Sequence, residues 1–200
     1  MRKTIILAVA ILAIVYGTGL LCDMEMLHEN VIRLHVVGAT DSEKDQTVKL
    51  AVKDAINETF NQLLVGVNSV EDAKTVILDH LSVLRATGEQ VLRDNGFQEH
   101  IWISLEQEAF PVREYDTFSL PSGVYTSLRI RIGEAEGRNW WCVVFPSLCL
   151  PAVGENFDDV AAGAGFSDSL CDTLTGEPEY ELRFFFLDWL GKLQNFFFEK

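Results

Sequence analysis

The 200-residue sequence predicts an α+β fold, in which a single domain with a mixed or antiparallel sheet packs against two or three helices after an N-terminal export segment. Three observations predict it. A short basic start is followed by a long apolar run. A β-branched stretch is followed by two long stretches with helical apolar spacing, and several strand-like stretches come next.

The first residues are typical of an export segment. Met1-Arg2-Lys3 is a short positive start, and the stretch from Thr4 to Leu21 is almost wholly apolar. Gly17 and Gly19 have the spacing that a signal peptidase accepts, which favours removal by a cut after Gly19. The alternative is a retained anchor, because the apolar stretch approaches the roughly 17 residues that span a membrane. Residues 1–22 are therefore predicted to be a signal peptide or a membrane anchor, and any membrane contact is expected there.

Composition excludes some classes of partner. The chain has 16 basic and 30 acidic residues, which give a formal net charge of −14. Such a surface repels phosphate backbones, so nucleic acid is not expected as a partner.

The predicted core, residues 28–151, begins with a strand over Val31–Val37, which Gly38 ends. Asp41 and Ser42 then offer helix N-caps, and Ser42 with Asp45 resembles a capping box. The apolar stripe of the helix that follows consists of Val48, Val52, Ile56, Phe60, Leu63 and Leu64. The side chains expected to face water are Lys49, Lys53, Asp54 and Glu58.

A second helix is predicted after Ser69, which forms another capping box with Asp72, and Asn95-Gly96 supplies its stop. Strands are predicted around 101–105, over 124–132 and over 140–145, and the last two are expected to form a hairpin.

The rest of the chain is less regular. Residues 152–178 are rich in Gly, Ala and Asp and are predicted to be a loop with a short helix near Phe157–Ala162. Residues 179–200 are expected to add a strand, Tyr180–Phe185, and an amphipathic helix, Phe186–Phe198.

The sequence contains no motif for an enzyme, a cofactor or a metal. It has no G-x-S-x-G elbow, P-loop or dinucleotide fingerprint, and His28-Glu29 lacks the second histidine of a zinc-protease helix. No catalytic, cofactor-binding or metal-ligating residue is therefore predicted. Outside the membrane a disulfide can persist, and Cys142 and Cys149 are the pair nearest in sequence. The alternative is that all four cysteines are buried thiols.

Trp140 and Trp141 are adjacent on a predicted strand, so their side chains point to opposite faces. One can enter the core, and the other is then covered by a loop or exposed as an anchor for a partner. Both alternatives remain open, and the anchor hypothesis fails if both tryptophans are fully buried.

Several stretches resemble stage II sporulation protein R, a family of endospore-forming bacteria. The similar stretches are Ile32–Ser42 with Asp45-Gln46, Lys49–Ala55, Leu120–Tyr125, Leu128–Gly133, Gly137–Cys149, and Arg183-Phe184 to Trp189. The Trp-Trp-Cys block within Gly137–Cys149 is the most specific of them.

The resemblance implies a signal rather than a catalyst. Members are exported from the forespore into the space between its membrane and that of the mother cell. There they activate a membrane-embedded aspartic protease, which processes a mother-cell sigma-factor precursor. The contact candidates for that protease are Trp140, Trp141, Asp41, Ser42 and Asp45. The alternatives are an exported hydrolase that acts on cell wall or peptides, and an anchored structural protein.

Overall fold

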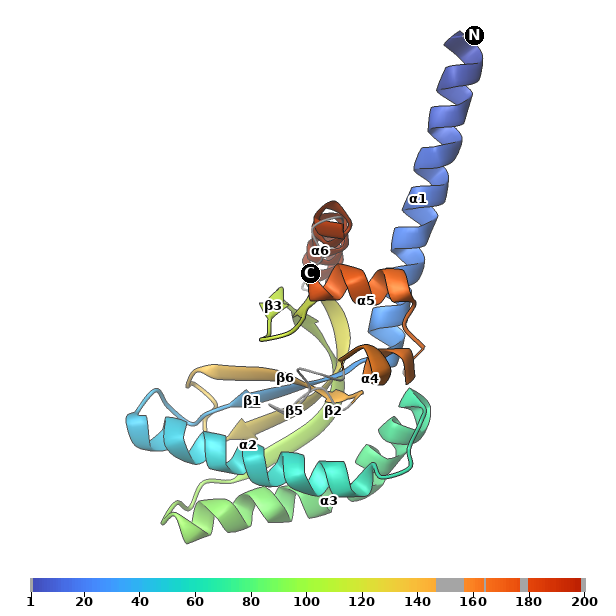
Figure 1. Ribbon diagram of the computed structural model, residues 1–200. Coiled ribbons are helices and arrows are strands. Elements are labelled where there is room, and N and C mark those ends of the chain that lie inside the picture. Colours follow the sequence, from blue (N-terminus) through green and yellow to red (C-terminus); the bar gives the residue numbers. More distant parts are fainter. Residues whose placement is uncertain (1, 147–156, 164, 177–179, 199–200) are drawn as a thin grey trace. The chain divides into compact units, whose positions relative to one another are not determined.

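Figure 1 shows the structure, a computed structural model that describes residues 2–146, 157–163, 165–176 and 180–198. Its elements in chain order are α1 (Arg2–Asn30), β1 (Ile32–Val37), α2 (Glu43–Leu63), α3 (Val70–Asp94), β2 (Ile101–Phe110), β3 (Arg113–Glu114), β4 (Ser119–Leu120), β5 (Gly123–Ile132), β6 (Asn139–Phe145), α4 (Phe157–Gly163), α5 (Asp168–Thr175) and α6 (Glu181–Phe198). They form two compact units. The terminal unit comprises segments 1–29, 109–124 and 166–200, and the sheet unit comprises segments 30–108 and 125–165.

Four strands form a mixed sheet in the order β2-β5-β1-β6. β1 is parallel to β5 and antiparallel to β6, so the predicted α+β fold with a mixed sheet is confirmed. The predicted hairpin between 124–132 and 140–145 is wrong, because β1 lies between these two strands. All six residues of β1 are buried, as befits a central strand. The loop 133–138 therefore joins β5 to β6 across β1, a distance of about 10 Å, or two strand spacings.

Helices α2 and α3 cover one face of this sheet (Figure 1). The N-caps predicted at Ser42 and Ser69 are confirmed, since Ser42 Oγ accepts from the Asp45 amide and Ser69 Oγ from the Asp72 amide, each at 3.1 Å. Asp41, the other candidate, precedes the cap of α2. Each cap satisfies one of the amides that the first turn of a helix leaves without a partner. Helix α3 ends at the predicted Asn95-Gly96 stop.

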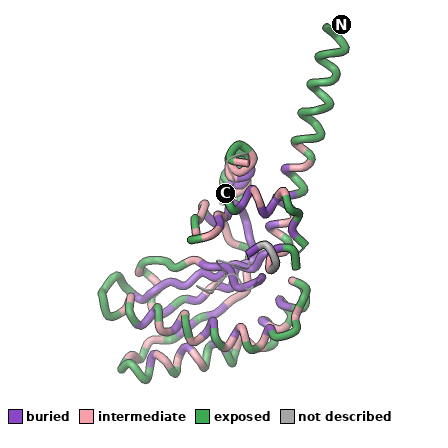
Figure 2. Tube along the Cα trace, in the orientation of Figure 1, coloured by how far each residue is buried: buried purple, intermediate pink, exposed green. Residues whose placement is uncertain are grey.

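The apolar faces of α2 and α3 form a core with the facing side of the sheet (Figure 2). The predicted stripe of α2 is confirmed, because its members are buried in that core or packed against it. The fully buried residues of the core include Leu34, Val52, Ile77, Leu84, Leu128 and Ile130. This core fixes α2 against β1 and so positions the loop that joins them.

The tail of the chain is more helical than the sequence predicts. Helix α6 runs from Glu181 to Phe198, so the strand predicted over Tyr180–Phe185 is wrong. Its apolar residues recur at steps of three and four from Leu182 onward, and this helical spacing continues through the aromatic run. Helix α5 lies inside the region predicted as a loop, capped by Ser167 and ended by a left-handed Gly176. The short helix expected near Phe157–Ala162 is confirmed as α4.

Helix α1 is long and apolar enough to cross a membrane, since the mean hydropathy of its most apolar 18 residues is 2.6. Its N-terminal part is exposed (Figure 2), whereas Leu20, Met24 and Leu27 near its other end are buried. The helix continues past residue 22, the predicted end of the export segment. This helix is compatible with export or membrane anchoring, and a cut after Gly19 stays a prediction.

Candidate functional site

Two loops of the sheet unit meet beside the start of α2: the loop after β1 and the loop before β6. Glu136 donates its amide to the Ala39 carbonyl at 3.1 Å, and Gly137 donates to the Gly38 carbonyl at 2.9 Å. A Cβ atom at Gly137 would collide with the backbone of Thr40. Glycine is therefore required at this position for the two loops to approach so closely.

Acidic and hydroxyl side chains hold these loops in place. Asp41 Oδ1 accepts the Arg138 amide at 2.6 Å and lies 3.6 Å from Arg138 Nε. Asp45 accepts a hydrogen bond from the Thr40 hydroxyl, and Ser42 caps α2. Of the three predicted contact residues here, Ser42 and Asp45 shape the loop, and Asp41 joins it to the loop before β6.

Lys49 fastens the two loops to α2. Its ammonium donates to Gln46 Oε1 at 2.6 Å and to the Arg138 carbonyl at 3.0 Å. The prediction that Lys49 faces water is wrong, because the loop before β6 covers it and leaves it 4% exposed. Burial lowers the pKa of Lys49, as does the nearby charge of Arg138, and Asp41 offsets part of this shift.

The two tryptophans lie on opposite faces of β6, as predicted. Trp140 is 39% exposed, and the Lys53 ammonium lies 4.8 Å from the centre of its ring. Trp141 is half-buried and stacks on His35, with ring centroids 5.4 Å apart. His35 Nδ1 in turn lies 2.7 Å from Glu108 Oε1. Trp140 thus has the exposure that an anchor requires, whereas Trp141 belongs to a polar network on the other face.

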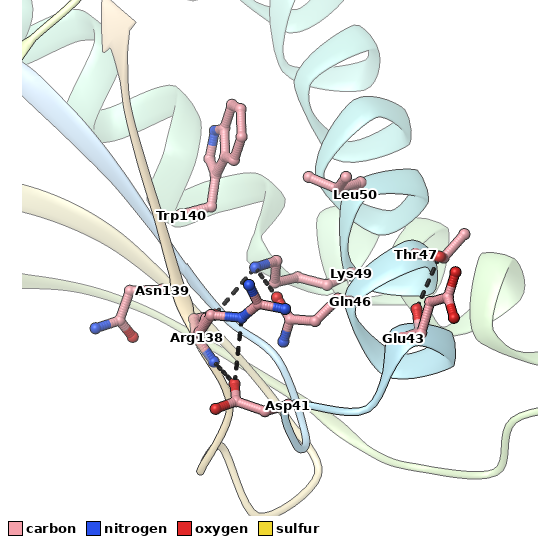
Figure 3. Close-up of a pocket in the computed structure, with 9 residues that line it drawn as sticks. All are labelled: Asp41, Glu43, Gln46, Thr47, Lys49, Leu50, Arg138, Asn139 and Trp140. Atoms are coloured by element: carbon pink, nitrogen blue, oxygen red, sulfur yellow. Dashed lines mark hydrogen bonds and ion pairs between the residues drawn. The ribbon is translucent and has the colours of Figure 1, made fainter.

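These loops and the first turns of α2 surround an open hollow of about 460 Å³ (Figure 3). The hollow is lined by Asp41, Glu43, Gln46, Thr47, Lys49, Leu50, Arg138, Asn139 and Trp140. Among the predicted contact residues, Asp41 and Trp140 line it, and Ser42, Asp45 and Trp141 do not. Their roles in binding a partner stay predictions.

Sequence reasoning did not single out Arg138, Lys49 or Leu50 for this site. The available signal was the position of Arg138 between Gly137 and the tryptophan pair. The hollow combines the exposed Trp140 and Leu50 with two basic residues, Arg138 and the buried Lys49, and it is also lined by the acidic Asp41 and Glu43. Within the described part of the chain, no group of three or more His, Cys, Asp or Glu side chains is placed to hold a metal ion.

The predicted disulfide concerns the end of β6. Cys142 is buried on β6, but Cys149 lies outside the described residues. The Cys142–Cys149 pairing therefore stays a prediction. Cys22 on α1 carries a free, exposed thiol.

Comparison with known proteins gives one consistent result. Residues 28–155 match the family described as Stage II sporulation protein R (spore_II_R). The chain is 26% identical, over 223 aligned positions, to the Stage II sporulation protein R of Bacillus subtilis (strain 168), and the match covers 96% of this chain and 99% of the relative. No solved structure matches the chain. The matched region contains every residue that lines the hollow.

Proposed function

The chain belongs to the stage II sporulation protein R family, and from this premise we propose that it is an exported sporulation signal. In this proposal it activates a membrane-embedded aspartic protease, which then processes the precursor of a mother-cell sigma factor. It acts in the space between the forespore and mother-cell membranes. Family membership supports the sporulation role, and the resemblance described above is the basis for the protease partner.

Helix α1 supports the export step. Its basic first residues stay in the cytoplasm while its apolar stretch enters the bilayer, so residues beyond it emerge outside. The chain then reaches its partner either released by a cut after Gly19 or tethered by α1. In both forms the residues that follow the apolar stretch of α1 lie on the outer side.

The observation that carries the proposal is the hollow with its exposed Trp140 and Arg138. Tryptophan and arginine are the residue types that most often dominate the binding energy of protein interfaces. Binding shifts the protease toward activity only if the hollow has a higher affinity for the active form. The proposal therefore treats the chain as a binding protein and not as an enzyme.

The predicted disulfide is part of this proposal, since it would hold the end of β6 in an oxidising compartment. Mass spectrometry of proteolytic fragments tests it. A linked fragment containing Cys142 and Cys149 that separates on reduction is the expected result, and two unlinked fragments would contradict it.

The test is co-expression in a non-sporulating host. The chain is produced with the candidate protease and its substrate, and substrate cleavage is measured. Trp140→Ala is compared with the matched control Trp102→Ala, because Trp102 is 47% exposed on β2, outside the hollow. Loss of an anchor residue costs about 2 kcal/mol of binding free energy, which is about 30-fold in affinity. Activation by Trp140→Ala should therefore fall about 30-fold when the chain is at a concentration below its Kd for the protease.

The outcomes separate the two parts of the proposal. Cleavage no higher than with the protease alone would sink the signalling function. Activation by the wild type with equal losses in Trp140→Ala and Trp102→Ala would sink the hollow as the contact surface.

A further inference from the structure

Helix α6 carries a continuous exposed apolar stripe in the terminal unit. Its members recur at steps of three and four, so they share one face of the helix. They are Phe185, Phe186, Trp189, Leu193, Phe196 and Phe197. All are large and exposed, and Phe197 reaches 67%. Such a patch exceeds the scattered apolar residues of an ordinary surface.

The opposite side of α6 is held by its own unit, which fixes the direction of the stripe. Asp188 Oδ1 accepts from the Ser122 amide at 3.0 Å and from its hydroxyl at 2.6 Å. Asn195 donates to the Phe110 carbonyl at 2.8 Å. Gly191 packs directly on the Ser122 backbone. The apolar stripe therefore cannot turn inward without breaking these bonds.

The same helix contacts α1 at a defined level. The rings of Tyr16 and Phe186 meet edge to face, with centroids 6.4 Å apart. Further along, Arg183 donates to Asp23 Oδ2 through Nη2 at 2.5 Å and Nε at 2.9 Å. An aromatic contact and a charged pair thus join α6 to two places on α1 that lie about two helical turns apart.

These contacts place the stripe relative to the apolar stretch of α1. At about 1.5 Å per residue, Tyr16 lies about 7.5 Å before Leu21, where that stretch ends. Interfacial helices bury their apolar face about 5–10 Å into the boundary between headgroups and acyl chains. Asp23 lies about 3 Å beyond Leu21, on the aqueous side of the membrane boundary. While α1 is in the bilayer, Phe186 is therefore at the depth of an interfacial helix.

We propose that α6 lies on the outer surface of the phospholipid bilayer, with this aromatic stripe between the headgroups. Phenylalanine and tryptophan are favoured at that boundary. Within Glu181–Phe198 two acidic and two basic side chains balance each other, so the contact is apolar and needs no anionic lipid. The exposed apolar surface of α1 continues into the stripe at Tyr16, which favours lipid as the occupant of both. The inference does not depend on the proposed function, because it says where the chain sits and not what it activates.

The test measures depth in the bilayer. The full chain carrying Cys22→Ser is reconstituted into phosphatidylcholine vesicles. An environment-sensitive nitrobenzoxadiazole probe is attached at Leu193→Cys in the stripe or at Lys192→Cys, which is exposed one position earlier. Nitroxide groups on the lipids, placed at shallow or deep acyl positions, then quench the probe. Both variants are anchored through α1, so any difference reports α6 alone.

The Leu193 probe should show blue-shifted emission and several-fold stronger quenching by shallow nitroxides than the Lys192 probe. Equal quenching at the two positions would overturn the proposal. A Leu193 probe that is shielded from aqueous iodide but not quenched by any lipid would also overturn it, since a protein would then occupy the stripe. A probe at Phe196→Cys repeats the measurement should the first variant fold poorly.

Discussion

Replacing Lys49 with methionine tests whether this buried ammonium joins α2 to the two loops of the hollow. Methionine keeps most of the apolar stem and removes both hydrogen bonds, to Gln46 Oε1 and to the Arg138 carbonyl. An acceptor left without its donor costs about 1–3 kcal/mol. Water can reach the exposed Arg138 and half-buried Gln46, so the lower end applies, about 1 kcal/mol each. Methionine also removes the cost of burying a charged ammonium, and this offsets part of the loss. A net destabilisation of about 1–2 kcal/mol is therefore expected.

Thermal unfolding of the full chain in detergent micelles, followed by tryptophan fluorescence, measures this effect. A loss of about 1–2 kcal/mol corresponds to a decrease in Tm of roughly 2–8 °C for a chain of this size. The matched control is Lys44→Met, since Lys44 is exposed on the same helix and should change stability by less than about 0.5 kcal/mol. Equal Tm values for Lys49→Met and Lys44→Met would refute the role of Lys49.

Three further substitutions test other contacts, each by urea unfolding of the full chain in micelles. Gly137→Ala forces a Cβ into the backbone of the loop after β1, and Gly191→Ala forces one into the turn between β4 and β5. Each substitution should lower the free energy of unfolding by about 1–3 kcal/mol. Gly163→Ala is the control, because a Cβ atom at Gly163 has no neighbour within 4 Å. Equal urea midpoints for all three variants would contradict the close packing. Burial tends to raise the pKa of Glu108, but hydrogen bonds with His35 and Ser127 and the charges of His35 and Arg129 together more than offset this and lower it. A depressed carboxyl pKa stabilises the fold above the unfolded value of about 4.3, and the contribution is lost as pH falls through the folded pKa. The stability lost in Glu108→Gln at pH 7 should therefore shrink below about pH 4, and a pH-independent difference would contradict the pairing.

Local signals in the sequence predicted most helices and their ends. Ser42 and Ser69 act as caps because the capping bond spans only three residues, which the sequence displays directly. Strand order is different, since it depends on pairing between segments far apart in the chain. The insertion of β1 between β5 and β6 has no local signal, and the short connection 133–138 favoured a hairpin instead. In α6, the three consecutive phenylalanines at 184–186 favoured a strand by propensity, and the longer helical spacing prevailed.

The hollow could be predicted only in part for the same reason. Asp41 and Trp140 were identified because each lies in a distinctive local sequence. Lys49 and Arg138 were not, because their contact joins residues 89 positions apart. Helical spacing places Lys49 beside the apolar stripe of α2, and a lysine there normally reaches water. Lys49 becomes part of the site only because the loop before β6 covers it, and Gly137 lets that loop approach the loop after β1 closely.

The charges around the hollow predict how protease activation depends on salt concentration. The chain has 30 acidic and 16 basic residues, and Asp41 and Glu43 line the hollow. Near Trp140, however, the Lys53 ammonium lies 4.8 Å from the ring centre, and Arg138 lines the same hollow. A partner that contacts Trp140 together with Arg138 and Lys53 should present carboxylates to these two cations, and such complementarity speeds association most at low salt. Because salt screens exposed charges over about 10 Å at 0.1 M, protease activation should weaken several-fold between roughly 0.05 and 0.5 M salt. Arg138→Gln should flatten this salt dependence, whereas the exposed control Arg85→Gln on α3 should not. If both variants show the wild-type salt dependence of activation, the partner does not meet the hollow through Arg138.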